Sequence, residues 1–518
     1  MTARRLDRRG AAASVLIAAL AAAGCTTLGP DHQRPTVSLP AGYGENAPAA
    51  SAGSAAQAPL PAEWWTLFGD RALDALVTKA LAANAEVAQA VARVEQADAL
   101  AREAAGATWP TLNAGANANR ARFSARSRSN ASGVAVEGNA FSASLSTSFE
   151  IDLWGRLARA NEAARAQLLA SEAARDTVRL TIAGAVAQAW FALRSLDVQV
   201  ATQRHTLGSR EEGARLVGQR LAGGAATRLD AEQAEVQRAE AALALRELMR
   251  QRQLVQSLLA LLVGEPGWTV AELPLPAPSA ASAASAATPS TASAPSSTSA
   301  STSASWTPVL PVTWTQTVPP APPPGLPSAL LERRPDIRRA EELLVSANAQ
   351  IGIARAAMYP QLSLTGALGV ESTALGELIS APARFWSLGF GLALPLFDGG
   401  RNAARADAAG ARQREAVAAY QQAVSSAFKE VADALSNLRA ARESEADAAA
   451  RSAAAARALQ LAQARFDAGY SGSLERLDAE RSAAAAALEV VRNRERQLAA
   501  TVELMKALGG GWPGLAGR

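Results

Sequence analysis

The chain has 518 residues, of which 49% are hydrophobic but only 5% aromatic, and its formal net charge is +4. Arginines and acidic residues are interleaved along it, without the basic and aromatic clusters that a nucleic-acid-binding surface needs. It has one cysteine (Cys25) and two histidines (His32 and His205), at no metal-ligand spacing. It also lacks a phosphate-binding loop and a nucleophile motif, so we expect no metal, no cofactor, no nucleic acid partner and no enzymatic activity.

The N-terminus is typical of an exported protein. Residues 1–24 combine a basic start, a short apolar run and small residues, which is the pattern of a signal peptide. Cys25 follows where bacterial lipoproteins are cut and acylated, although Ala22 stands where leucine is usual. We therefore expect residues 25–62 to be a lipid-anchored extended segment; the alternative is a plain signal peptide that happens to contain a cysteine. By resemblance to bacterial lipoproteins, Thr26 after the cysteine favours the outer membrane.

The rest of the chain contains two similar sequence repeats. A first repeat over 63–265 and a second over 328–510 are separated by a Ser/Ala/Pro-rich linker, 266–327, and followed by a tail, 511–518. Arg156 and Arg401 occupy matching positions, and both repeats carry the quartet Leu-Asp-Ala-Glu. The linker cannot bury a core, so we expect it to be disordered or extended.

Each repeat contains two segments that alternate between apolar and polar residues, at about 110–121 and 140–153 and at about 360–370 and 385–397. In the second segment the odd positions are apolar or carry a methyl group, and the even positions are Ser142, Ser144, Ser146, Ser148, Glu150 and Asp152. This pattern fits a half-buried sheet in water as well as membrane-crossing strands. If the strands cross a membrane, the even positions face a water-filled lumen. Four strands cannot close a barrel, so several copies would have to share one.

Long helices follow the strands. We expect them at 156–222 and 229–263 in the first repeat and at 401–467 and 474–508 in the second, because no proline interrupts either stretch. A continuous helix over the first range would be about 100 Å long, several times the width of a globular domain. A helix with heptad spacing precedes each strand pair, which predicts helix pairing.

Four stretches resemble one known family: EWWTLFGDRALDALVTKAL (63–81), SFEIDLWGRLARA (148–160), LPSALLERRPDIRRAEELLVSANAQIGIARAAMYPQLSLTG (326–366) and LPLFDGGR (394–401). They are similar to the signatures of TolC-like outer-membrane efflux factors, and more narrowly to the lipoprotein branch often labelled NodT. The resemblance covers nearly all of the chain after the signal peptide.

This resemblance implies a mainly α-helical protein with a membrane β-barrel portion. Three copies would share a twelve-stranded barrel that continues into a long periplasmic α-helical barrel. The homotrimer would be an outer-membrane channel, a passive conduit that exports small molecules. Its partners would be a periplasmic adaptor protein, an inner-membrane pump and outer-membrane lipid.

In this family, acidic residues beyond the long helices ring a narrow periplasmic aperture. The matching positions are Asp230, Glu475 and Asp478. An equally good interpretation is that Asp230 and Asp478 stabilise helix N-termini. Better-known members tie the aperture shut with a tyrosine and an arginine, and this chain has Phe466 and Ser471 there. The alternative to a channel is an exported coiled-coil structural or adhesion lipoprotein.

Overall fold

The computed structural model describes residues 27–37, 61–123, 136–269, 318 and 333–511. The expected signal peptide, Cys25 and most of the expected linker and tail lie outside these residues. The chain divides into two compact units. The strand unit comes from residues within 1–37, 91–174 and 336–423, and the helix-core unit from residues within 38–90, 175–335 and 424–518.

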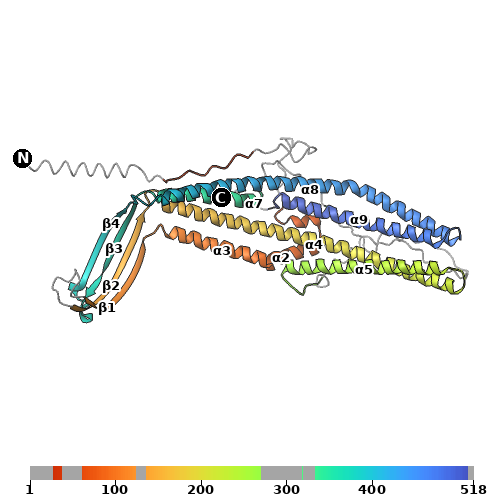
Figure 1. Ribbon diagram of the computed structural model, residues 1–518, viewed down its shortest axis with the longest axis horizontal. Helices are drawn as coiled ribbons and strands as arrows, with labels where there is room; N and C mark the ends of the chain where they lie inside the picture. The colour runs from red at the N-terminus through yellow and green to blue at the C-terminus, as the bar shows by residue number, and fades with distance from the viewer. Residues whose placement is uncertain (1–26, 38–60, 124–135, 270–317, 319–332, 512–518) are drawn as a thin grey trace, which may run out of the picture. The chain divides into compact units, whose positions relative to one another are not determined.

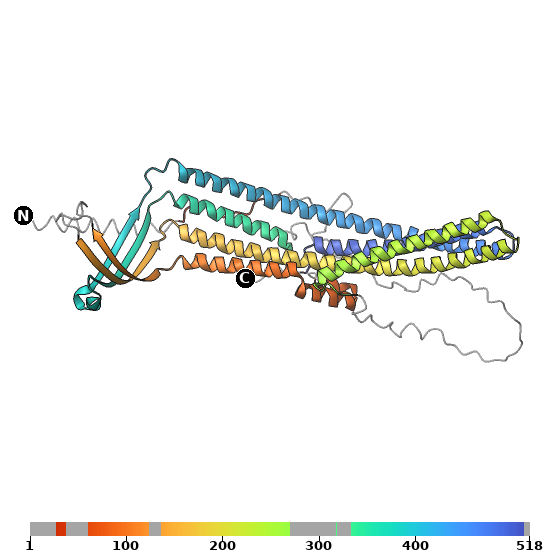
Figure 2. The ribbon, with the colours of Figure 1, turned by 60° about the horizontal axis from the view of Figure 1, so that its bottom comes forward.

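The strand unit contains one antiparallel sheet with the strand order β1-β2-β3-β4 (Figure 1). Its strands are β1 (Thr111–Phe123), β2 (Val136–Ile151), β3 (Gln361–Ser372) and β4 (Arg384–Ala393). The strands of each repeat pair with one another, and β2 pairs with β3 across the repeats. Figure 2 shows the four strands side by side, with the twist that L-amino acids impose on a sheet. One sheet is therefore built from both halves of the chain.

The register of the sheet separates its two faces. Directly paired residues share a face, so the row Ala114, Leu145, Leu368 and Trp386 lies on one side. The next row, Gly115, Ser144 and Gly369, lies on the other. Continuing the alternation gives a mainly apolar face that runs across all four strands and a second face in which serine, asparagine, threonine and glycine predominate. Phe385, which pairs with Gly369, also lies on this second face.

Strand β4 differs from the expected 385–397. It ends at Ala393, so Leu394 and Leu396 are not part of the apolar face, and Leu396 is 89% exposed. Pro395 explains the early end, because proline has no N–H to donate to a strand ladder. β2 begins four residues before the expected start at residue 140.

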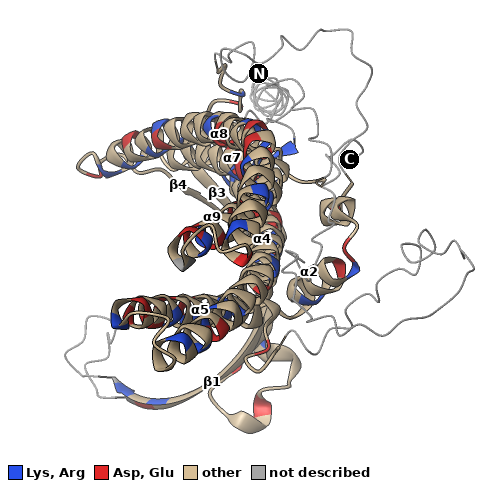
Figure 3. Ribbon diagram, turned by 90° about the vertical axis from the view of Figure 1, so that its right-hand side faces the viewer, with Lys and Arg blue, Asp and Glu red and all other residues tan. Residues whose placement is uncertain are grey.

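The long helices are α4 (Arg156–Ala222) and α8 (Arg401–Asp467). Each is followed along the chain by a shorter helix: α4 by α5 (Arg228–Val263), and α8 by α9 (Ser473–Ala507). Both long helices end in the same way. Ala225 N–H bonds to Arg220 O and Tyr470 N–H to Arg465 O, each just after a glycine with positive φ. Figure 3 shows acidic and basic residues interspersed along all four helices. Within the described part of the chain, no helix is both long and apolar enough to span a membrane.

The first heptad-spaced segment forms two helices, α2 (Arg71–Ala83) and α3 (Ala85–Gly106), where we expected one. Asn84 separates them with an extended backbone, and its Oδ1 accepts hydrogen bonds from the N–H groups of Glu86 and Val87. Its side-chain amide also donates to Leu262 O. Asn84 therefore caps α3 and ties it to α5. The second such segment is a single helix, α7 (Pro335–Ala356).

A hydrophobic core holds the helix-core unit together. Its aromatic members are Trp64, Trp65 and Phe68 of the 3-10 helix η1 (Trp64–Phe68), together with Trp190 and Phe191 of α4. Residues of α2, α5 and α9 pack around them. Asp70 caps α2 and also accepts a hydrogen bond from Trp190 Nε1 at 2.8 Å. The Glu-Trp-Trp motif of the sequence thus anchors the first repeat to its long helix.

Candidate functional site: the sheet, its junction with the helices and the helical turns

The four predicted lumen-facing serines lie together on the polar face of β2. Ser142 is paired with Asn117, Ser144 with Gly115, and Ser146 with Asn113, so small and polar residues of β1 extend the same face. The neighbouring strand β3 continues it with residues such as Ser363 and Thr365. Most of this face can be wetted, whereas the opposite face is mainly apolar.

The two predicted lumen-facing acids hold the junction between β2 and α4. Arg156 donates to both carboxylate oxygens of Glu150, at 2.8 and 2.6 Å. Asp152 lies just past the strand, and its Oδ2 accepts the N–H of Ala158 in the first turn of α4 at 2.8 Å. These carboxylates are therefore engaged in joining a strand to a helix, which the alternation pattern alone could not reveal.

Aromatic residues and an N-terminal segment meet at the same junction. The Trp154 ring lies 4.9 Å from that of Tyr359, and Trp154 Nε1 donates to Pro360 O at 2.8 Å. Leu28 N–H donates to Trp154 O at 3.0 Å. Thr27 lies so close to Gly155, whose φ is +74°, that a side chain there would overlap it. Gly155 is thus required both for the bend and for this contact.

Ion pairs hold the rest of this N-terminal segment (residues 27–37) in place. The Arg159 side chain is 6% exposed and donates to Asp31 at 2.8 Å and to Glu162 at 2.7 Å. Arg34 makes two hydrogen bonds to Glu341, at 2.7 and 2.6 Å. Because buried guanidinium groups need such partners, the segment is a fixed part of the strand unit.

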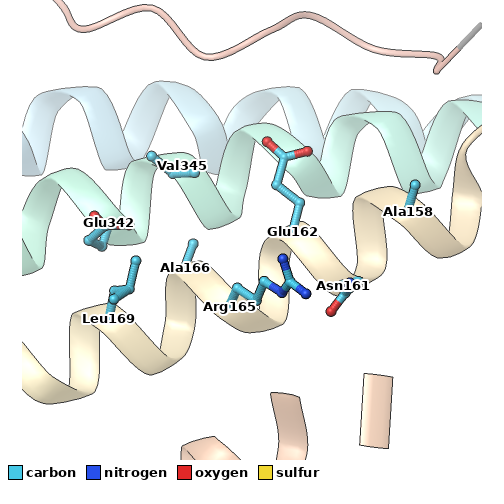
Figure 4. Close-up of a pocket in the computed structure, with 8 residues that line it drawn as sticks. All are labelled: Ala158, Asn161, Glu162, Arg165, Ala166, Leu169, Glu342 and Val345. Carbon is cyan, nitrogen blue, oxygen red and sulfur yellow. The ribbon is translucent and has the colours of Figure 1, made fainter. Parts of the chain in front are cut away.

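A shallow groove of about 300 Å³ lies between α4 and α7 in the strand unit (Figure 4). The groove is open because Ala158 and Ala166 have small side chains, and Glu162, Arg165 and Glu342 line it. Burial, followed by the nearby Glu341 charge, raises the pKa of Glu342. No three His, Cys, Asp or Glu side chains of the described residues are grouped so as to hold a metal ion.

In the helix-core unit, Asp230 forms a capping box at the start of α5. Its carboxylate accepts the N–H and hydroxyl of Thr227, at 2.9 and 2.7 Å, and its own N–H donates to Thr227 Oγ1. The hydrogen bonds from the side chain and backbone of Thr227 lower the pKa of Asp230. Asp230 therefore stabilises the N-terminus of α5, which is the role that we expected as an alternative to a place at the periplasmic aperture.

Glu475 and Asp478 also have partners within the chain. Glu475, in the first turn of α9, lies 3.4 Å from Arg465 Nε at the end of α8. Asp478 accepts a hydrogen bond from Arg481 Nη2 at 2.6 Å. All four of these side chains are at least 45% exposed. Their charges are therefore accessible to water as well as paired.

The most buried acid of this region is Glu480, which the sequence pattern did not single out. It is the last residue of the second Leu-Asp-Ala-Glu quartet and is 5% exposed. Ser209 donates to its Oε1 at 2.6 Å, and Arg210 Nη1 lies 3.7 Å from its Oε2. Arg210 also donates to Gln237 and to Leu477 O, so this cluster joins α4 and α5 of the first repeat to α9 of the second.

The signal that could have revealed Glu480 is the asymmetry between the repeats. Its counterpart in the first quartet, Glu232, is 69% exposed and lies 3.8 Å from Arg228. Burial lowers the pKa of Arg210, and the Glu480 charge acts in the opposite direction. The second repeat has Ala454 and Ala455 at the positions that match Ser209 and Arg210. Only one of the two glutamates could therefore have such partners.

Phe466 stands where better-known relatives of the suspected family have a tyrosine. Its ring is contacted by two guanidinium groups, Arg220 of α4 at 5.4 Å and Arg476 of α9 at 5.2 Å from the ring centre. Ser471, the other departure, has a buried hydroxyl without a hydrogen-bond partner in the described part of the chain. Phe466 has no hydroxyl to donate a hydrogen bond, and its contacts with these two arginines are of the cation–π type.

Two variants from the matching quartets test the importance of the Glu480 cluster. Glu480→Ala leaves Arg210 buried beside no carboxylate, and we expect it to lower the free energy of unfolding by about 3–5 kcal/mol. Glu232→Ala removes an exposed pair and should cost at most about 1 kcal/mol. Denaturant titration of the detergent-solubilised protein, followed by circular dichroism of the helices, measures both. Equal midpoints for the two variants would contradict this assignment.

The arrangement defines a class of protein. Two repeats, each with a strand pair feeding directly into a long helix, build one two-faced sheet and a helical bundle, as in TolC-like channels. The outer membrane efflux protein family model matches residues 76–265 and 326–510. The chain therefore belongs to the outer membrane efflux protein family, as its motifs indicated.

Individual relatives agree with this assignment. The chain is 35% identical to the outer membrane protein OprJ of Pseudomonas aeruginosa over 96% of its length and 95% of the relative's. It is 31% identical to the cation efflux system protein CusC of Escherichia coli, covering 95% of this chain and 97% of that one. The open state of the Neisseria gonorrhoeae MtrE outer membrane channel superposes with a TM-score of 0.74 at 29% identity, over 94% of this chain and 98% of that one.

Proposed function

We propose that three copies of this chain form a closed passive conduit through the bacterial outer membrane. The observation that carries this proposal is the sheet. It has a continuous apolar face, a polar face and two edge strands, β1 and β4, without a neighbour in the described chain. Four strands cannot close a barrel, and an open edge cannot exist in lipid. Pairing of β4 with β1 of the next copy satisfies both edges.

The helix-core unit offers a second surface for neighbouring copies. Leu229, Val236 and Leu243 follow one another at heptad spacing on α5 and are 66%, 56% and 64% exposed. A row of large apolar residues at this spacing is typical of helices that pack against another helix. In the proposed trimer this row contacts a helix of the next copy.

The proposed conduit works with an adaptor protein and an inner-membrane pump, and its cargo is small molecules. The relative CusC is named for cation efflux. The four methionines and two histidines of this chain do not cluster in its sequence, which gives no support for a copper or silver path. We propose that the pump selects the cargo, because a wide water-filled conduit needs no tight binding site. We assign the chain no catalytic role.

Charge substitution at neighbouring positions of β2 tests the orientation of the sheet. Leu145→Arg places a charge on the proposed lipid face, which costs about 2–4 kcal/mol near the middle of a bilayer. Ser144→Arg places it on the polar face, where water can solvate it. We expect heat-modifiable trimers in outer-membrane extracts for Ser144→Arg but not for Leu145→Arg. Assembly of both variants, or full solubility of the delipidated protein, would favour a soluble scaffold instead.

We further propose that Asp230, Glu475 and Asp478 of three copies ring the periplasmic aperture. Nine accessible carboxylates at one constriction would favour cations over anions. Asp230→Asn keeps a helix-capping side chain, so the triple variant Asp230→Asn/Glu475→Gln/Asp478→Asn removes charge with little loss of helix stability.

Planar-bilayer recordings test this ring of carboxylates. We expect the triple variant to lose cation preference, with a change in single-channel conductance. Glu247→Gln, on an exposed part of α5, serves as the control. Identical reversal potentials for the triple variant and the wild type would remove the aperture role and leave only the helix-stabilising one.

Finally, we propose that Cys25 carries the lipid anchor. It precedes Thr27 by two residues, which limits it to about 7 Å from that residue. Thr27 itself packs on Gly155 at the junction of β2 and α4, beside the aromatic pair of Trp154 and Tyr359. Aromatic residues favour the membrane interface, where an acylated cysteine would also lie.

Metabolic labelling with a fatty acid tests the anchor. Cys25→Ser should abolish incorporation while the trimer still forms, because Arg159, Glu341 and Trp154 hold residues 27–37 in place. Label that persists in Cys25→Ser would show that another residue is acylated.

A further inference from the structure

The apolar face of the sheet carries charge only at one end. Along the described strands, its charged residues are Arg120 and Arg122 of β1, Glu137 of β2 and Arg384 of β4. Arg122 is paired directly with Glu137, and Arg384 with Val370 of the apolar face. All four lie at the end of the strands that is remote from the helices, which we call the outer rim. The remaining positions of this face are uncharged.

The outer rim has an excess of positive charge that its single carboxylate satisfies only loosely. Glu137 lies 3.5 Å from Arg120 and 3.6 Å from Arg122, and all three side chains are more than half exposed. Charge-assisted hydrogen bonds between such groups are usually about 2.7–2.9 Å long. The guanidinium groups are therefore available to a stronger anion. Arginine is suited to phosphate because its planar donors bind two oxygens at once.

We propose that Arg120, Arg122 and Arg384 bind the phosphate groups of lipid headgroups at the outer surface of the membrane. The proposal rests on the membrane-spanning conduit described above. The same face presents apolar side chains just below the arginines, so one lipid could place its acyl chains and its phosphate on adjoining surfaces. Trp386, two residues from Arg384 on this face, is 80% exposed, as expected at the boundary between headgroups and acyl chains.

Closure of the conduit would gather the three arginines. Arg120 and Arg122 lie on one edge strand, β1, and Arg384 on the other, β4. Pairing of these edges between copies brings Arg384 of one copy toward Arg120 and Arg122 of the next. A trimer would then have three such sites, one at each junction between copies. A charge at the middle of the lipid face would be costly, but near the interface it is tolerated.

Lipid binding to the purified, full-length trimer tests the proposal. The probe is a bisphosphorylated disaccharide lipid, compared with the same lipid lacking one phosphate, and bound lipid is counted by native mass spectrometry. We expect Arg120→Gln/Arg122→Gln/Arg384→Gln to weaken binding about tenfold or more. Arg451→Gln, an exposed arginine of α8, is the matched control and should bind as the wild type does.

Glu137→Gln gives a test of opposite sign, because it removes the competing carboxylate and should strengthen binding. If the triple variant does not assemble, the single variants Glu137→Gln and Arg384→Gln test the proposal in its place. Unchanged affinity in these variants, or equal affinity for the two lipids, would overturn the rim site. Displacement of the lipid by inorganic phosphate would show a site for the free ion instead.

Conductance and heat-modifiable migration, recorded on the same samples, separate this proposal from the proposed function. A wild-type protein that shows neither channel conductance nor heat-modifiable migration would refute the conduit. Normal conductance with unchanged lipid affinity in the variants would refute only the rim site.

Discussion

The unpaired backbone of two strands is the constraint on which the rest of this molecule depends. Among the described residues, β1 and β4 each have one edge of N–H and C=O groups without a partner strand, and the sheet has a mainly apolar face that runs across all four strands. Lipid can cover that face, but it cannot satisfy an open edge. The proposed association of copies, closure of the sheet and separation of a wet interior from a lipid exterior would meet both conditions.

The junction between strand and helix then has to hold a sharp change of structure in place. The strand changes to a helix within a few residues, and the carboxylates of Glu150 and Asp152 bind groups in the first turn of α4. Gly155 provides the bend, and the N-terminal segment packs on it. A mobile junction would decouple the sheet from the helices, so ion pairs and a close backbone contact are concentrated here.

The two repeats are similar in sequence but have different roles. Their long helices end in the same hydrogen-bonded turns, after 67 residues in each case. Yet Glu480 is buried against Ser209 and Arg210, whereas its counterpart Glu232 is exposed. The duplicated helices therefore pack against unlike neighbours. Polar clusters between the repeats, and the Phe466 ring between two arginines, hold the second hairpin to the first.

Alternation of period two, long proline-free stretches and the repeat offset were sufficient to predict the strands and the long helices, because these are local properties of the chain. The family was indicated separately, by the resemblance of four sequence motifs. The break at Asn84, the end of β4 before Pro395 and the partners of Glu150 depended on contacts or on backbone hydrogen bonds. Burial of Glu480 could not be predicted from its own quartet, since the two quartets are identical and only the residues that pack against them differ. A local pattern specifies the conformation of a segment, whereas the neighbours of a side chain come from residues distant in the sequence.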